Sequence, residues 1–121
     1  MLCPFAAVSL FPLGTIKATK GQVEEHYHPT MAHFFVRCKE CKHPIFTRTN
    51  KFKLDRYPLN HMPKQEDGTI PEVYRPKIHI EYAERVFDIA DDLPKYADFP
   101  KSLGGSGKLM TNDGKDTGVE E

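Results

Sequence analysis

Cys38 and Cys41 are the residues of this chain whose types and spacing most clearly indicate chemistry. Two thiols separated by two residues on a tight turn can hold two corners of a tetrahedral zinc site. A closed structural site needs four ligands, and the remaining cysteine of the sequence is Cys3. The sequence therefore shows half of a zinc site.

Two other interpretations of the C-x2-C spacing are a pair of free thiols and a redox pair. A thioredoxin-like redox motif accompanies a βαβ pattern, and the sequence around Cys38 has no such pattern. Residues 33–37 and 44–49 instead read as strands on either side of the turn. Flanking strands favour a metal knuckle, in which backbone N–H groups of the turn point at the thiolates.

Histidines near the knuckle in sequence are further candidate ligands. His43 extends the motif to C-x2-C-x-H, and His26 and His28 could chelate from one face of a strand. In a chain this polar, surface histidines are the favoured interpretation, and the same holds for His33 and His61. The residues that we predict to bind metal are Cys38 and Cys41.

Length and composition limit the function classes. The chain has 121 residues, 17 basic and 17 acidic side chains, and a formal net charge of zero, so one domain and no nucleic-acid partner are expected. The longest apolar run is far too short to cross a bilayer, so no membrane partner is expected. Three cysteines do not form a disulfide framework, and a reducing, cytoplasmic location is the default.

The elements that must position the knuckle are short. Ten prolines and eight glycines leave few windows for a long helix. Alternation and β-branched or aromatic content predict strands over 5–13, 15–19, 33–37, 44–49, 54–59, 77–82 and 86–89. A single helical turn is expected over 91–96, a polar loop over 61–68, and a flexible tail over 104–121.

Three segments together resemble the family of glutathione-dependent formaldehyde-activating enzymes and centromere protein V. They are Pro4-Phe5-Ala6-Ala7 through Lys20-Gly21, then Phe35-Val36-Arg37-Cys38-Lys39-Glu40-Cys41, and His79-Ile80-Glu81-Tyr82 through Asp98-Phe99-Pro100. The last segment is the most specific, because its order of residues is hard to obtain by chance. The resemblance covers about residues 4–103.

The resemblance implies a mostly β, Mss4-like fold of short antiparallel strands around a C-x2-C zinc knuckle, incomplete at the N-terminus. It also implies a domain over 1–103 that lacks the family's N-terminal cysteine-rich part. Cys38 and Cys41 match the second half of a four-cysteine structural zinc site, whose early C-x-C would lie before Met1. Lys42 replaces the family's usual glycine, which implies a strained or altered turn.

The activity implied by the resemblance is that of a zinc-dependent carbon–sulfur lyase acting on a glutathione–formaldehyde adduct. The catalytic C-x-C-x2-C loop of the family would come just before Pro4, and Cys3 is given no ligand role because its spacing from Phe5 differs. The catalytic residues therefore stay unassigned. The alternative is an inactive, truncated or degenerate member that serves as a zinc-binding or interaction module. A homodimer in which two chains share one zinc is a further alternative.

Overall fold

The computed structural model describes residues 6–27 and 34–121, and it divides the chain into two compact units. One unit is Ala7–Arg75, and the other contains Pro76–Glu121. The domain over 1–103 that the sequence suggested stays a prediction. The structure confirms a mostly β protein with antiparallel sheets: its described residues form strands and short 3-10 helices and no α-helix.

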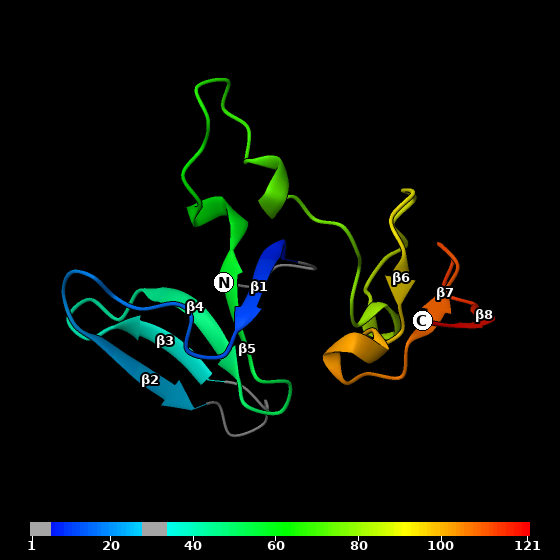
Figure 1. The fold of residues 1–121 in the computed structure, drawn as a ribbon, viewed down its shortest axis with the longest axis horizontal. Helices are drawn as coiled ribbons and strands as arrows, with labels where there is room; N and C mark the ends of the chain where they lie inside the picture. Colours follow the sequence, from blue (N-terminus) through cyan, green and yellow to red (C-terminus); the bar gives the residue numbers. More distant parts are fainter. Residues whose placement is uncertain (1–5, 28–33) are drawn as a thin grey trace. The chain divides into compact units, whose positions relative to one another are not determined.

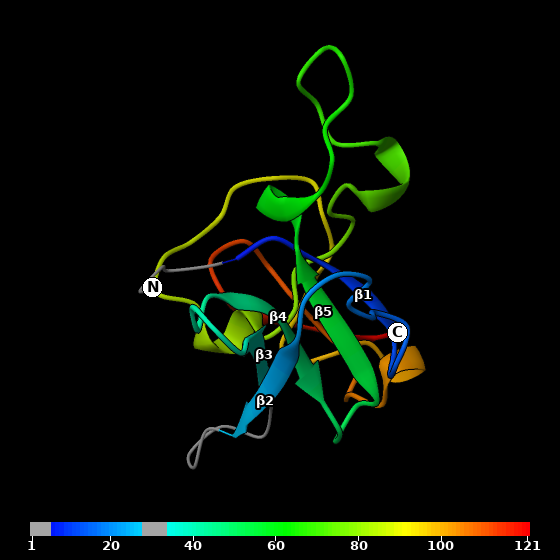
Figure 2. The ribbon, with the colours of Figure 1, turned by 90° about the vertical axis from the view of Figure 1, so that its left-hand side faces the viewer.

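The Ala7–Arg75 unit is built on a five-stranded antiparallel sheet in the order β1-β5-β4-β3-β2 (Figure 1). The strands are β1 Val8–Pro12, β2 Val23–Tyr27, β3 Phe34–Cys38, β4 Pro44–Thr49 and β5 Leu54–Pro58. Figure 2 shows β1 beside β5, and β2 forms the opposite edge of the sheet. Two 3-10 helices, η1 Leu59–His61 and η2 Glu72–Tyr74, follow β5.

The core of this unit lies on the central strands. Val36 of β3 is 2% exposed and Phe46 of β4 is 5% exposed, and the two are paired across the β3–β4 ladder. Alternation along a strand sends every second side chain to one face, so this pair defines the buried face. The strands predicted over 33–37, 44–49 and 54–59 correspond to β3, β4 and β5 within one or two residues at their ends.

The segment predicted as a strand over 15–19 is a loop that donates hydrogen bonds to a buried carboxylate. The side chain of Asp55 is fully buried, and its Oδ2 accepts hydrogen bonds from the backbone N–H groups of Gly14 (3.1 Å) and Ile16 (3.2 Å). Arg48 donates to the same carboxylate through Nε (2.7 Å) and Nη2 (3.2 Å). Backbone donors that bond a side chain are not available to a ladder, so the segment forms a loop.

The second unit holds a three-stranded antiparallel sheet in the order β6-β7-β8 (Figure 1). Its strands are β6 Lys95–Tyr96, β7 Lys108–Met110 and β8 Asp116–Glu120, and its 3-10 helices are η3 Tyr82–Glu84 and η4 Lys101–Leu103. Tyr82 and Phe99 are each 2% exposed and form its core. The Tyr82 hydroxyl donates to the carbonyl of Asn112 and accepts from the backbone N–H of Ile89.

Several sequence predictions differ from the structure in this unit. The pattern over 77–82 forms only a single bridge, His79 to Lys95, because Glu81 has a left-handed backbone with φ 54° that interrupts an extended strand. Residues 86–89 form no strand, and the side chain of Val86 is 70% exposed. The helical turn predicted over 91–96 is absent, and β6 takes its last two residues.

Residues 104–121 contain β7 and β8, where the composition predicted a flexible tail. Glycine is needed at a close approach here: a Cβ on Gly105 would lie 2.1 Å from the carbonyl oxygen of Phe99. The end of the chain is also hydrogen-bonded, since the N–H of Glu121 donates to the Gly107 carbonyl and its carbonyl accepts from Lys101. The glycines that suggested flexibility thus shape turns between paired strands.

Candidate metal centre

The C-x2-C segment forms a closed turn at the end of the β3–β4 hairpin. The N–H of Lys42 donates to the carbonyl of Cys38 (3.0 Å), and the N–H of Cys38 donates to the carbonyl of His43 (2.9 Å). Residues 39–44 are all exposed. The strands on both sides therefore hold the turn at the surface, with Cys38 half-buried and Cys41 exposed.

Lys42 has a left-handed backbone with φ 62°. This conformation favours glycine, and it costs about 1 kcal/mol for a residue with a Cβ. The Lys42 ammonium forms an ion pair with Glu24 on β2 (2.7 Å), and Arg37 binds the same carboxylate oxygen (2.8 Å). Exposed pairs of this kind contribute little to stability, so they offset only part of that cost.

Backbone N–H groups of the turn face the thiol of Cys38. They lower the pKa of that thiol, with the N–H of Cys41 the largest cause, the N–H of Glu40 next, and the Cys41 thiol a third donor. Burial and the negative charge of Glu40 oppose the shift. The thiolate is the form of cysteine that binds metal, so the turn favours the state that a zinc site requires.

The other candidate ligands are not gathered around the two thiols. The His43 ring packs against the His61 ring, with centroids 5.7 Å apart, and His26 lies exposed on β2. Within residues 6–27 and 34–121, no three side chains of His, Cys, Asp or Glu are arranged to hold a metal ion. Cys3, His28 and His33 lie outside the described residues. The structure thus places Cys38 and Cys41 together on one turn, apart from the other candidate ligands among the described residues.

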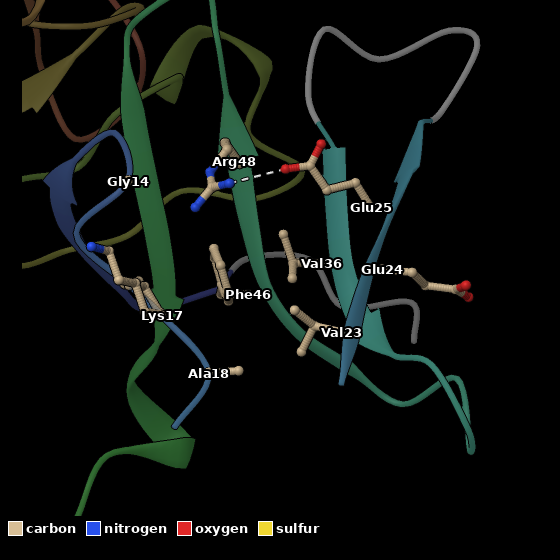
Figure 3. Close-up of a pocket in the computed structure, with 10 residues that line it drawn as sticks. Gly14, Lys17, Ala18, Val23, Glu24, Glu25, Val36, Phe46 and Arg48 are labelled. Carbon is tan, nitrogen blue, oxygen red and sulfur yellow. Dashed lines mark hydrogen bonds and ion pairs between the residues drawn. The ribbon is translucent and has the colours of Figure 1, made fainter. Parts of the chain in front are cut away.

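A pocket of about 490 Å³ lies beside the strands that carry the knuckle (Figure 3). Val23, Val36 and Phe46 form its strand side, and Ala18 and Lys17 lie on the segment opposite. The remaining residues around it are Gly14, Ile16, Glu24, Glu25 and Arg48. Val23 is the register partner of Cys38, so the pocket and the knuckle share the β2–β3 ladder.

The charged side chains at this pocket differ in how they are paired. Arg48 is neutralised by Asp55 and by Glu25 (2.9 Å), and Glu24 points away from the pocket interior toward Arg37 and Lys42 (Figure 3). Lys17 is exposed, and its ammonium is the remaining cation of the lining. The pocket therefore combines an apolar wall with a cation that could bind a carboxylate of a small ligand.

A second polar cluster, in the unit that contains Pro76–Glu121, was not predicted. Lys95 is 2% exposed, and its Nζ donates to the Asp91 carboxylate (2.7 Å) and to the carbonyls of Asp91 and Leu93. His79 Nε2 lies 2.7 Å from the other oxygen of that carboxylate. The Asp-x3-Lys spacing was visible in the sequence, but the pairing with His79 comes from the β6 bridge.

Lys95 and His79 together change the acidity of Asp91. Their hydrogen bonds, with that of Lys95 the larger, lower the pKa of Asp91 from 3.8 to about 2. All three donors of the Lys95 ammonium are used within the cluster, which indicates a structural role. In the same unit, the Arg85 guanidinium stacks on the Tyr82 ring at 4.9 Å.

Comparison with known proteins identifies no relative. Searches with family models, against curated proteins and against solved structures each gave no match. In the part of the chain that the structure describes, no helix has the length and apolar character to cross a bilayer.

Proposed function

We propose that this chain is a zinc-binding domain of the type found in glutathione-dependent formaldehyde-activating enzymes and centromere protein V. The observation that carries the proposal is the turn from Cys38 to Lys42. It presents two thiols on one surface, directs N–H groups at Cys38, and keeps a left-handed backbone at Lys42 where that family has glycine. Thiolates at this spacing fit zinc, and a structural zinc would supply folding energy by holding the hairpin end together.

The activity we propose for this type of domain is that of a carbon–sulfur lyase acting on a glutathione-derived small molecule. The pocket beside β2 and β3 supports a small ligand, because its volume lies in the range of known ligand sites. Lys17 would bind a carboxylate of the ligand, and Val23, Val36 and Phe46 would exclude water from its apolar part.

A second candidate function is a zinc-binding or interaction module without catalysis. It is favoured by the ligand set, because the described residues supply two thiols to the knuckle and no further cluster suited to a catalytic metal. In this case the pocket would serve binding alone, and the knuckle would be a structural or assembly element.

Zinc content and turnover measured on the same purified chain test these proposals. Zinc that is retained by the wild type and lost in Cys38→Ser and Cys41→Ser would support the knuckle. Zinc-dependent consumption of formaldehyde and glutathione, followed by NMR, would then support the lyase, whereas bound zinc without turnover would support the module. A chain that binds no zinc under reducing conditions would contradict the lyase and the zinc-binding module.

A further inference from the structure

We propose that two copies of this chain bind one zinc ion between them, each copy contributing Cys38 and Cys41. The inference rests on the zinc-binding knuckle proposed above and specifies how its ligand set is completed. Each copy would supply one edge of the tetrahedron, and a two-fold axis through the metal would relate the two edges.

Exposure of the turn makes this arrangement accessible. Cys41 and its neighbours from Lys39 to Pro44 are all exposed, and Cys38 is half-buried at the end of β3. The hydrogen bonds from Lys42 to Cys38 and from Cys38 to His43 keep the backbone of the turn closed. A second copy can therefore approach both thiols without displacing any strand of the sheet.

Glu24 and His43, two candidate ligands close to the turn, already have partners within the same copy. Glu24 accepts from Lys42 and Arg37 through one carboxylate oxygen, and His43 packs against His61. In the described portion of the chain no third ligand completes a group with the two thiols. Two thiols from another copy are the donors best matched to zinc, since they reproduce the four-cysteine set of structural sites.

Charge around the turn favours assembly only when the metal is bound. Arg37, Lys39 and Lys42 outnumber Glu24 and Glu40, so two turns brought together without metal carry like charge and repel. Zinc bound by four thiolates has a net negative charge, and cationic side chains beside each pair of thiolates stabilise it. Dimerisation is therefore expected to depend on zinc.

The sheet register also distinguishes this dimer from one formed by strand addition. Val23 at the start of β2 is opposite Cys38, so the knuckle lies at that end of the edge strand. If two copies paired antiparallel through β2, the two knuckles would lie at opposite ends of the joined strands. Sharing of one zinc therefore requires contact from knuckle to knuckle, and it leaves the β2 edge free.

The test is the stoichiometry and mass of the full chain under reducing conditions. Native mass spectrometry with added zinc is expected to give a dimer with half a zinc per chain, and EDTA should return it to monomer. Titration with cobalt should end at half an equivalent, with the charge-transfer absorption of four thiolates. Cys38→Ser and Cys41→Ser should each abolish the dimer. Both changes lie on the surface turn, so circular dichroism should still show the β-sheet, although the stability that the metal supplies is lost.

Two control variants address ligands from the same copy. Cys3→Ser and His43→Ala are expected to leave the dimer and the half-equivalent endpoint unchanged. One zinc per monomer, or loss of zinc in either control, would overturn sharing while the zinc-binding knuckle of the proposed function stands. A dimer that persists in EDTA would also overturn it. No zinc binding at all would overturn this inference and the proposed function together.

Discussion

At the scale of single residues, Asp55 and Arg48 form a contact that joins β4 to β5 and orders the loop after β1. The carboxylate is fully buried and accepts from Arg48 and from two backbone N–H groups, of Gly14 and Ile16. Burial alone would raise the pKa of Asp55, but these hydrogen bonds outweigh it and the net shift is downward. The ionised carboxylate therefore holds the loop over the sheet.

Replacing Arg48 with methionine should strongly destabilise this unit. The substitution leaves a buried carboxylate without its ionic partner, and breaking such a pair costs about 3–5 kcal/mol. Urea unfolding followed by circular dichroism measures the change. Arg75→Met is the matched control, because Arg75 is exposed and bonds only surface groups, and it should change stability by less than about 1 kcal/mol. Equal effects of the two changes would show that the Asp55 contact is not important.

The left-handed backbone of Lys42 leads to a prediction about the knuckle turn. Lys42→Asn and Lys42→Val both remove the ion pair to Glu24, so the two variants are matched in charge. Asparagine tolerates φ 62° and a β-branched residue does not, so the valine variant should be less stable by about 1–2 kcal/mol.

Thermal unfolding of the two Lys42 variants gives the difference in stability, and competition with a chelator gives the zinc affinity. Valine should also weaken zinc binding, because it disturbs the turn that presents Cys38 and Cys41. Indistinguishable variants would show that the turn readily adopts another backbone conformation.

At the scale of elements, one carboxylate connects the segment before β6 to the core of its unit. Asp91 accepts from Lys95 and His79, and it also accepts from the N–H of Leu93 (3.1 Å). The Lys95 side chain is buried, and its remaining hydrogen bonds go to the backbone carbonyls of Asp91 and Leu93. All the acceptors of the Lys95 ammonium therefore lie within the segment 91–95. This local closure replaces the helical turn that the sequence predicted.

The lowered pKa of Asp91 predicts loss of stability in acid. Because this pKa is 3.8 in the unfolded chain and about 2 in the folded protein, the unfolded chain binds the proton more tightly. The contribution of Asp91 is complete above pH 3.8 and is lost as the pH falls toward 2.

Asp91→Asn should remove the part of the acid dependence of stability that falls between pH 3.8 and about pH 2. Unfolding by urea at a series of pH values measures it, with the exposed neighbour Asp92→Asn as the control. An Asp91→Asn variant with the same acid dependence as the wild type would contradict the assignment.

At the scale of the whole molecule, the chain consists of two units whose stabilities can be separated experimentally. The unit that contains Pro76–Glu121 uses the end of the chain as a strand, because β8 pairs with β7 and Glu121 bonds Gly107 and Lys101. Deletion of 116–121 removes that strand and the partners of these backbone groups. It should therefore reduce the stability of this unit.

Amide hydrogen exchange distinguishes the two units in the deletion variant. Amides of this unit, such as those of Tyr96 and Ala97, should exchange faster, while protection of Val36 and Phe46 in the other sheet should be retained. Deletion without any effect on Tyr96 or Ala97 would show that residues 116–121 behave as the flexible tail that their composition suggests.

Local patterns were sufficient to predict the elements next to the knuckle. The strands β3 and β4 are rich in aromatic and β-branched residues, and the C-x2-C spacing marks the turn between them. A mostly β class, without long helices among residues 6–27 and 34–121, followed from the frequency of proline and glycine. These properties depend on residues within a few positions of one another, so they can be read along the chain.

Only the tertiary structure decided the contacts that join distant residues. The loop after β1 forms because Asp55, about forty residues away, takes its backbone donors, and nothing in the local sequence of Gly14 or Ile16 predicts that partner. The bridge between His79 and Lys95, and the strands in 104–121, depend in the same way on partners elsewhere in the fold.

The sequence by itself determined the two thiols and their turn, whereas the structure determined their exposure and their separation from other ligands. The reason is that spacing is a property of the chain, while burial and coordination depend on what folding brings into contact.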